Sequence, residues 1–494
     1  MDVGKPIKDY YVNLDEISAK ISILRYSDEF VPTYKVIFPK IEPATEAMLD
    51  SIRERLIVEI AINAEETLTQ EQAGKLKDAF FKRSLELIKE SFGKIDGNDA
   101  KILAEILVNK SLGLGPLEIL LKDENLEEIV VNSSKEPVWV YHRKLGWLKT
   151  NIMIPSEAEI YNYAAGIGRK IGVQITNLSP LMDAYLTTGD RSNATLFPIS
   201  SRGHTLTIRR FARKPWTITD FIASQTITPE AAAFLWLAIQ YEMNVLVVGG
   251  TASGKTSLLN VMTNFIPPTH RIVSIEDTRE LQLPDFLHWV PLTTRAANSE
   301  GKGQVTMLDL MVNSLRMRPD RILVGEIRRG REAEVLFEAI HTGHSVYSTL
   351  HANTAQEAVK RLSNPPIAIP VSMLGALDLV AVMHRDRRKE IRRVLEIVEI
   401  VAGVEDNVTE LNPVFRWIPS TDEVIALNKS SRVLDQLKLY AGMEHGDFLK
   451  DQKQKVSILN WMKQKSMTDI NAVGRLVSEY YMEPESVMAK VGMK

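Results

Sequence analysis

Cysteine is absent from the 494 residues of the sequence. Disulfide bonds, thiol catalysis and zinc or iron–sulfur sites with cysteine ligands are therefore excluded. An excess of charge of one sign is also absent, because 60 lysines and arginines oppose 63 aspartates and glutamates and leave a net charge of -3. This balance gives no general electrostatic reason to bind nucleic acid or an anionic membrane, although it leaves room for a local basic patch.

A long hydrophobic run is the third feature that the sequence lacks. A membrane-spanning helix needs about 20 consecutive apolar residues. The nearest candidate, residues 365–383, contains three early prolines and Asp378, so we interpret it as a buried loop and helix. The first five residues lack the apolar core of a secretory signal, which predicts a cytoplasmic protein. The composition, 45% hydrophobic and 25% charged, is typical of a globular protein, and the length predicts about three domains.

The pattern along the chain divides it into four segments. Residues 1–110 show helical spacing of leucine and isoleucine and predict a helical module. Residues 111–213 combine short strand patterns with one helix, which predicts a mixed α/β domain, and residues 214–228 predict a linker with a short helix. In residues 229–494, helices alternate with apolar strands and further helices follow. This alternation predicts an α/β fold with a parallel sheet covered on both faces.

The strongest local motif is a glycine-rich segment that matches G-x-x-x-x-G-K-[ST], between an apolar strand and a helix. Glycine lets the backbone fold around phosphate with its N–H groups pointing inward, and the helix start adds partial positive charge. Lys255 would reach the β- and γ-phosphates of ATP, and the Thr256 hydroxyl would bind Mg²⁺. The alternative is a glycine-rich turn with an exposed lysine, but the flanking strand and helix favour the phosphate loop. The predicted nucleotide-binding residues are Gly249, Gly250, Thr251, Ala252, Ser253, Gly254, Lys255, Thr256 and Ser257.

Acidic residues end two of the apolar strands that follow. Glu326 comes after residues 322–324, and Glu276 with Asp277 comes after residues 272–275. A P-loop enzyme needs a carboxylate at such a strand end to hold Mg²⁺ or its water. We expect Glu326, with Thr256, to hold the metal and its water shell, and Glu276 to position or activate the attacking water. The alternative, that strand-end acids serve only as helix caps, stays open on these observations.

Histidine is concentrated in one segment, where His341, His344 and His351 fall within eleven residues. His344 and His351 flank a predicted strand at odd spacing, which places them at opposite ends and on opposite faces. A metal site with both histidines is therefore unfavourable. Because an imidazole can donate a hydrogen bond to phosphate, we expect His344 to sense the γ-phosphate and His351 to lie nearer a subunit contact.

Taken in order, these motifs resemble those of the type II/IV secretion ATPase family. Residues 249–256, 275–278, 318–328 and 342–353 are similar to the Walker A, Asp box, Walker B and His box of that family. The middle domain resembles the N-terminal domain of the family at residues 115–117, 128–129 and 207–211. The resemblance covers residues 110 to 400, in round numbers.

The resemblance implies an ATP- and Mg²⁺-dependent motor. It implies a RecA-like core, an N-terminal α/β domain that swings on a linker, and a homohexameric ring. Rings of this family power pilus assembly, protein secretion, DNA transfer or the archaeal motility filament. Bacterial type II members carry a four-cysteine zinc module, so this cysteine-free chain is more similar to the archaeal branch. The implied partners are a polytopic inner-membrane platform protein and, indirectly, pilin-like subunits, with peripheral attachment to the cytoplasmic membrane through a partner.

Three arginines of the middle domain complete the predicted site. The Pro-Asp-Gly-Ser-Arg segment of the family appears here as Thr188-Gly189-Asp190-Arg191-Ser192. An arginine at Arg191, Arg209 or Arg210 would supply positive charge to the departing γ-phosphate when the linker closes. The alternative for Arg209 and Arg210 is pairing with surface acids.

The sequence disfavours two other classes of function. A switch GTPase specifies guanine through Asn-Lys-x-Asp, but the Asn-Lys at residues 428–429 is followed by two serines and the Asn-Lys at residues 109–110 by serine and leucine. A DNA translocase would have a similar core. The one dense basic run, residues 385–393, includes Asp386 and Glu390, which favours a solvated turn over a nucleic-acid groove.

Overall fold

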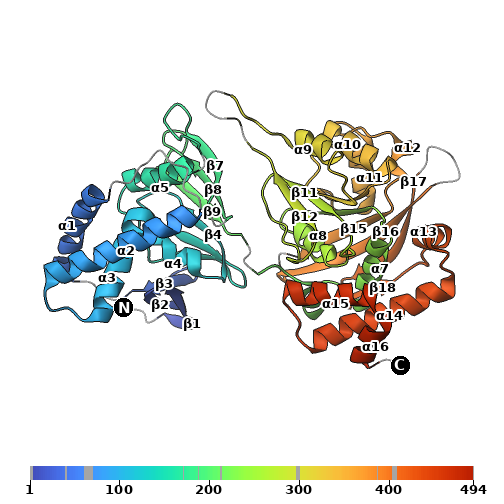
Figure 1. Ribbon diagram of the computed structural model, residues 1–494, viewed down its shortest axis with the longest axis horizontal. Helices are drawn as coiled ribbons and strands as arrows, with labels where there is room; N and C mark the ends of the chain where they lie inside the picture. Colours follow the sequence, from blue (N-terminus) through green and yellow to red (C-terminus); the bar gives the residue numbers. More distant parts are fainter. Residues whose placement is uncertain are drawn as a thin grey trace. The chain divides into compact units, whose positions relative to one another are not determined.

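A computed structural model describes residues 4–38, 42–60, 70–170, 172–186, 189–211, 214–295, 297, 301–386, 388–402 and 409–492. The chain forms two compact units, which Figure 1 shows with the elements labelled. The first comprises Met1–Arg213 with Asn298–Lys302, and the second comprises Lys214–Ala297 with Gly303–Lys494. The expected four-part division with a swinging linker stays a prediction.

The first unit contains a nine-stranded sheet in the order β1-β2-β3-β6-β5-β4-β9-β8-β7. Neighbouring strands are antiparallel except for β3 and β6, which are parallel. The strands are β1 (Lys5–Leu14), β2 (Ile17–Arg25), β3 (Thr33–Ile37), β4 (Leu126–Val131), β5 (Trp139–His142), β6 (Gly146–Thr150), β7 (Leu181–Tyr185), β8 (Arg191–Thr195) and β9 (Thr205–Arg209).

The prediction of an entirely helical segment over residues 1–110 is wrong for β1–β3. In β2, Ile17, Ala19 and Ile21 are buried, and the residues between them are exposed or half-buried. This period of two is the signature of a strand with one face on a core. The segment is further anchored by Asp123, whose Oδ2 accepts hydrogen bonds from the hydroxyls of Tyr10 (2.5 Å) and Tyr34 (2.6 Å).

The helices of the first unit follow these strands. They are α1 (Pro43–Glu59), α2 (Gln70–Phe92), α3 (Gly97–Leu112), α4 (Leu117–Lys122) and α5 (Glu157–Lys170). Helices α1–α3 share a separate hydrophobic core that includes Leu49, Phe80 and Leu107. The predicted helical character is therefore present in the described residues between 43 and 112.

The second unit contains another nine-stranded sheet, in the order β12-β11-β13-β14-β10-β15-β16-β17-β18. The strands from β12 to β15 are parallel, and β16–β18 continue the sheet in antiparallel fashion. Their bounds are β10 (Val245–Gly249), β11 (Ile272–Glu276), β12 (Trp289–Thr293), β13 (Arg321–Val324), β14 (Ser345–Leu350), β15 (Leu379–Asp386), β16 (Ile391–Ala402), β17 (Thr409–Ile418) and β18 (Glu423–Ala426).

The strand order identifies the core of this unit. Strand β10 leads into the glycine-rich loop, and β14 lies between it and β13, the strand that precedes Glu326. A strand inserted between those that carry the phosphate loop and the second acidic motif is the arrangement of RecA-like P-loop ATPases. The predicted α/β fold with a RecA-like core is confirmed.

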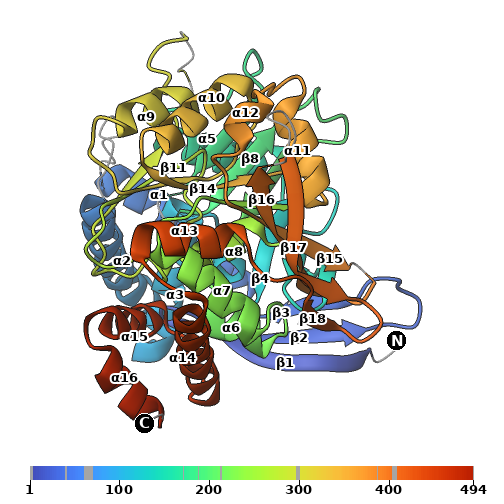
Figure 2. The ribbon, with the colours of Figure 1, turned by 90° about the vertical axis from the view of Figure 1, so that its right-hand side faces the viewer.

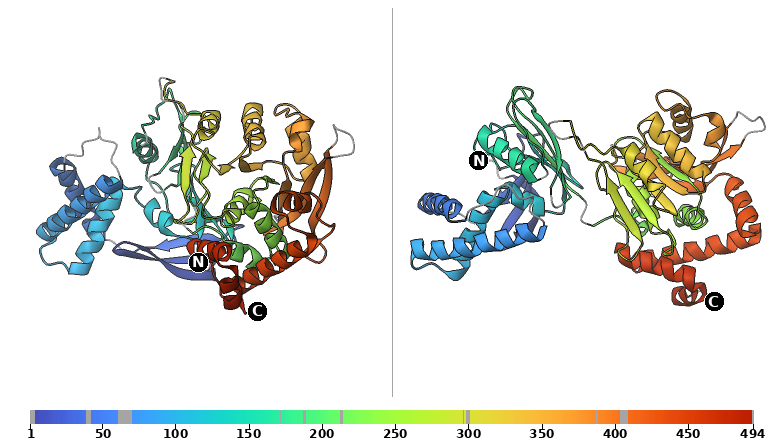
Figure 3. Two further views of the ribbon diagram at one scale, coloured as in Figure 1. Left: turned by 45° about the vertical axis from the view of Figure 1, so that its right-hand side comes forward. Right: turned by 45° about the horizontal axis from the view of Figure 1, so that its top comes forward.

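Helices cover both faces of this sheet. Along β10, Val245 and Val247 belong to the core with α7 and α8, whereas Leu246 and Val248 belong to the core with α9–α11. Figure 2 labels these helices, and in Figure 3 the yellow and orange helices lie on one side of the sheet and the green and red ones on the other. The helices are α6 (Ile218–Ala223), α7 (Pro229–Gln240), α8 (Lys255–Thr263), α9 (Met307–Ser314), α10 (Gly330–His341), α11 (Ala355–Ser363), α12 (Val371–Leu374), α13 (Arg432–Ala441), α14 (His445–Gln464), α15 (Ile470–Met482) and α16 (Pro484–Val491).

The segment 365–383 is a loop, helix α12 and the first part of β15. Across the described ranges, every helix is either too short or too polar to cross a membrane.

Candidate functional site

The glycine-rich loop turns between β10 and α8 with backbone angles that need glycine. Gly254 precedes the first residue of α8 in the left-handed conformation, with φ of 98°. At Gly249, a Cβ atom would lie 2.5 Å from the Met383 carbonyl oxygen and 2.5 Å from Ser253 Oγ. A side chain at Gly249 would need a shift of the surrounding backbone, and one at Gly254 would strain the loop itself, so both positions need glycine. This is the geometry that aims backbone N–H groups at an anion.

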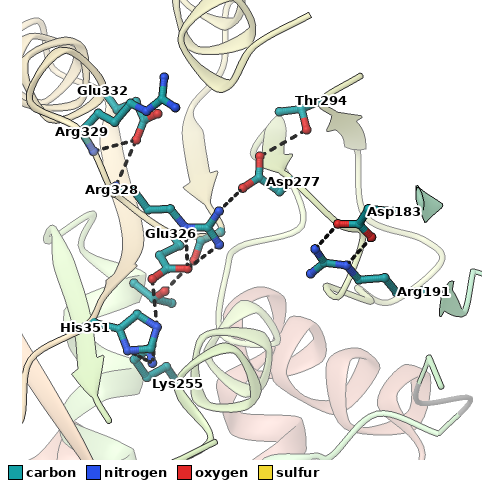
Figure 4. A network of polar contacts seen from close by, with 12 residues as sticks. Asp183, Arg191, Lys255, Asp277, Thr294, Glu326, Arg328, Arg329, Glu332 and His351 are labelled. Carbon is teal, nitrogen blue, oxygen red and sulfur yellow. Dashed lines mark hydrogen bonds and ion pairs between the residues drawn. The ribbon is translucent and has the colours of Figure 1, made fainter. Parts of the chain in front are cut away.

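Lys255 is tied to the sheet edge by two contacts. Its Nζ donates to the Gly250 carbonyl oxygen at 3.1 Å and lies 3.2 Å from Nδ1 of His351 (Figure 4). The Nε2 atom of that histidine lies 3.0 Å from Oε1 of Glu326. Burial, followed by the charge of Lys255, lowers the pKa of His351. The neutral imidazole therefore accepts from the ammonium at Nδ1 and donates from Nε2 to the carboxylate.

A second set of charges continues from Glu326. Arg328 donates to Oε2 of Glu326 from Nε at 3.0 Å and from Nη2 at 2.8 Å, and from Nη1 to Oδ2 of Asp277 at 2.6 Å. The Thr294 hydroxyl donates to the other carboxylate oxygen of Asp277 at 3.2 Å. Figure 4 shows the continuous network from Lys255 to Thr294. The carboxyl ends of three parallel strands thus meet beside the phosphate loop, as expected for an open α/β sheet.

Glu276 is the last residue of β11 and is buried. Its Oε1 accepts hydrogen bonds from the backbone N–H groups of Glu280 (2.9 Å) and Leu281 (3.0 Å), while its Oε2 is buried with no hydrogen-bond partner. Burial raises the pKa of this carboxyl group to about 7. It packs against Gly325, where a Cβ atom would lie 3.4 Å from Glu276 Cγ. A carboxyl group that titrates near neutral pH is suited to take a proton from water.

His344 lies at the wrong edge of the sheet for the role that the sequence predicted. It precedes β14, whereas His351 follows it, and β14 runs parallel to β10. Six strand residues separate the two histidines by roughly 20 Å, so only His351 reaches the phosphate loop. Nδ1 of His344 instead lies 3.2 Å from the Ala339 carbonyl oxygen and 3.1 Å from the Thr342 hydroxyl. The structure therefore contradicts the assignment of the γ-phosphate contact to His344, and it places His351 beside Lys255 of the phosphate loop.

The two histidines give a matched pair of variants. We expect His351→Ala to lower ATP turnover by about ten- to a hundredfold, because it removes the neutral imidazole that links the Lys255 ammonium to the Glu326 carboxylate. His344→Ala should leave turnover within about twofold of the wild type, since it lies at the other strand end. Steady-state phosphate release from both purified variants checks this. Equal losses in the two variants would contradict the placement.

Several residues of this site have no role in the prediction from sequence. The Asn353 side chain lies at the loop, because a Cβ atom on Gly250 would be 3.3 Å from its Oδ1. Asp277 and Arg328 form part of the charge network, and the strand-end rule that identified Glu276 and Glu326 applies to them too. Arg392 donates from Nε to the Ala252 carbonyl oxygen at 3.2 Å. No local sequence signal indicates that last contact.

The three predicted arginines lie in the first unit. Arg191 begins β8 and is the register partner of Arg209 at the end of β9. Arg191 donates through Nε to Asp183 Oδ1 at 2.9 Å and through Nη2 to Oδ2. Nη1 of Arg210 donates to the carbonyl oxygens of Asp123 and Leu126, so this side chain helps to fasten its own unit. Arg209 is exposed. Of the predicted segment 188–192, Thr188 lies outside the described residues.

The chain is similar to several known proteins. The family described as type II/IV secretion system protein matches residues 191–387. An uncharacterized protein of Methanocaldococcus jannaschii is 33% identical over 473 residues, which cover 91% of this chain and 85% of that protein. The type IV secretion system protein PtlH of Bordetella pertussis is 31% identical over 306 residues, 55% of this chain and 89% of that protein. The crystal structure of the VirB11 ATPase of Brucella suis matches with 26% identity and a TM-score of 0.30, over 58% of this chain and 96% of that one.

Proposed function

The chain belongs to the type II/IV secretion ATPase family, and from this premise we propose that it is an ATP-hydrolysing motor for a pilus-like filament or for protein secretion. The observation that carries the proposal is the contact series Lys255–His351–Glu326 at the end of the phosphate loop. It brings a cation, a hydrogen-bond donor and a carboxylate together where the γ-phosphate of ATP would lie.

The residues present fit a nucleotide with Mg²⁺. The loop at 249–254 would offer backbone N–H groups to phosphate, and Thr256 lies in the first turn of α8. The carboxylate of Glu326 already accepts hydrogen bonds from cationic or N–H donors on both oxygens. Thr256 and Glu326 would hold the metal or its waters, and the metal would supply charge compensation for the phosphates. Across the described ranges, no cluster of three acidic or histidine side chains offers a separate metal site.

In this mechanism each protein group has one task. Lys255 orients the terminal phosphates and offsets their charge, and His351 reports whether the γ-phosphate is present through its contact with Lys255. Glu276, with a pKa of about 7 and an unpartnered Oε2, takes the proton of the attacking water. Glu326 would hold the metal's water shell, whereas Glu276 has the unpartnered oxygen that can take the proton.

The experiment that tests this function is Glu276→Gln. We expect turnover to fall by on the order of a hundredfold while the affinity for ATP changes by less than about threefold, since the base acts only in the chemical step. In the wild type, kcat should rise with pH through about 7, as the carboxyl group ionises, and the variant should lose that rise.

Phosphate release across pH and binding of a fluorescent ATP analogue give the two readouts. Glu334→Gln, an exposed acid on α10, is the matched control and should behave as the wild type. A loss of ATP binding that parallels the loss of turnover would contradict the assignment of Glu276 as the base.

The wider assembly is proposed from the family. We infer a homohexameric ring with the first unit joined to the motor by a swinging linker at 214–228. We also infer that it acts at the cytoplasmic membrane through a polytopic partner protein, with pilin-like subunits reached indirectly and without nucleic acid. A ring places residues of one subunit against the nucleotide of the next. Mixing two inactive variants can therefore restore activity in a ring but not in independent monomers.

A further inference from the structure

The hairpin formed by β15 and β16 covers one end of the phosphate loop. Arg392 of β16 donates from Nε to the Ala252 carbonyl oxygen at 3.2 Å, although the two residues are 140 positions apart. A Cβ atom on Gly254 would lie 3.5 Å from Cδ of this arginine and 3.3 Å from Cε of Met383. Two side chains of the hairpin therefore flank the last turn of the loop before α8.

The site consequently has two distinct sides. On one, Asn353 lies beside Gly250, and Lys255 contacts His351, which in turn contacts Glu326. The other side carries the Gly254 end of the loop and Arg392. Because the P-loop lysine contacts the β- and γ-phosphates, the remaining α-phosphate belongs at the helix start, on the side of the arginine.

Arg392 differs from the adjacent arginine in its ion pairing. The adjacent Arg393 is neutralised by Asp422, with Nε and Nη2 at 2.8 Å from the two carboxylate oxygens, and it also donates to the Ser224 carbonyl oxygen at 3.1 Å. Within the part of the chain that the structure describes, no carboxylate forms an ion pair with Arg392. Its Nε contact fixes the guanidinium plane, and its two terminal nitrogens retain N–H donors for an anion.

We propose that Arg392 binds the α-phosphate of the nucleotide. The inference rests on the proposed ATPase function and adds a binding residue from the antiparallel part of the sheet, outside the family's phosphate and acidic motifs. The charge of the α-phosphate changes little during hydrolysis, so this contact stabilises the bound substrate and the transition state equally. Its loss should raise KM and leave kcat almost unchanged.

Arg392→Gln is the sharpest variant, because glutamine keeps an N–H donor for the Ala252 carbonyl oxygen and removes the charge. We expect KM for ATP and the dissociation constant of ADP to rise about tenfold or more, the loss of a charge-assisted hydrogen bond, with kcat within about threefold. Pyrophosphate, which needs only the Lys255 side, should bind within about twofold of the wild type. Arg388→Gln, an exposed arginine of the same hairpin, is the matched control.

Two results would overturn the inference. Unchanged ADP affinity in Arg392→Gln would show that Arg392 does not contact the α-phosphate. An equal loss of affinity for ADP and for pyrophosphate would show that the arginine only supports the loop. Thermal unfolding of each variant separates these results from misfolding. If the wild-type protein binds neither ADP nor pyrophosphate, the proposed function itself fails, which is a different outcome from either of these.

Discussion

Replacement of Lys255 by alanine is expected to lower ATP turnover by about a thousandfold or more and to weaken nucleotide binding as well. The amine is the only cation that contacts both the loop backbone, at the Gly250 carbonyl oxygen, and His351 among the described residues. Burial lowers its pKa, while the charges of Glu326 and Glu280 oppose that shift. A cation held in this partly buried position interacts more strongly with phosphate than an exposed one would, so its removal affects both binding and the transition state.

Phosphate release and binding of a fluorescent nucleotide measure the two effects of Lys255→Ala. Lys360→Ala, at an exposed position of α11, removes the same charge away from the loop and should retain full activity. Arg392→Gln offers a second comparison, because it is expected to raise KM and leave kcat almost unchanged, whereas Lys255→Ala should impair both binding and turnover. Normal turnover in purified Lys255→Ala would show that the glycine-rich loop is not the phosphate site.

The parts of the site that the sequence predicted are those set by local backbone chemistry. Gly249 and Gly254 occupy positions where a side chain would collide or strain the chain, so the motif implies the turn directly. Glu276 and Glu326 follow short apolar runs, and parallel strands bring such ends to one edge. These inferences need only the period of the pattern and the rule about strand ends.

The parts that were missed depend on direction or on distant pairing. The spacing of His344 and His351 indicates that they lie at opposite ends of β14, but it does not say which end faces the loop; the strand pairing with β10 decides that. In β2, the alternation of Ile17, Ala19 and Ile21 was present in the sequence and was outweighed by the helical pattern that follows. The contact of Arg392 joins segments 140 residues apart, and its charge pattern alone resembles a solvated turn.

Arg209→Ala is expected to lower turnover by about a thousandfold, the effect of a missing arginine finger. The other two candidate arginines, Arg210 and Arg191, already have partners within the first unit. Arg210 donates to the carbonyl oxygens of Asp123 and Leu126, so Arg210→Ala should lower the thermal stability of the first unit instead. Arg191 is already paired with Asp183. Arg202→Ala, which removes an exposed arginine paired with Glu136 at 3.1 Å, is the matched control.

Mixing two inactive variants shows whether Arg209 acts on its own subunit or on the next one. A subunit with Arg209→Ala retains its phosphate loop, and a subunit with Lys255→Ala retains its arginine. In a mixed ring, an intact loop from the first meets an intact arginine from the second if the arginine acts across the interface. Activity of the mixture well above that of either variant alone would therefore place Arg209 in trans. Mixed rings that stay inactive, with mixing demonstrated by mass spectrometry, would instead assign the arginine to closure of the linker within one subunit. In that case every site of the mixture lacks either Arg209 or Lys255, because both come from the same subunit.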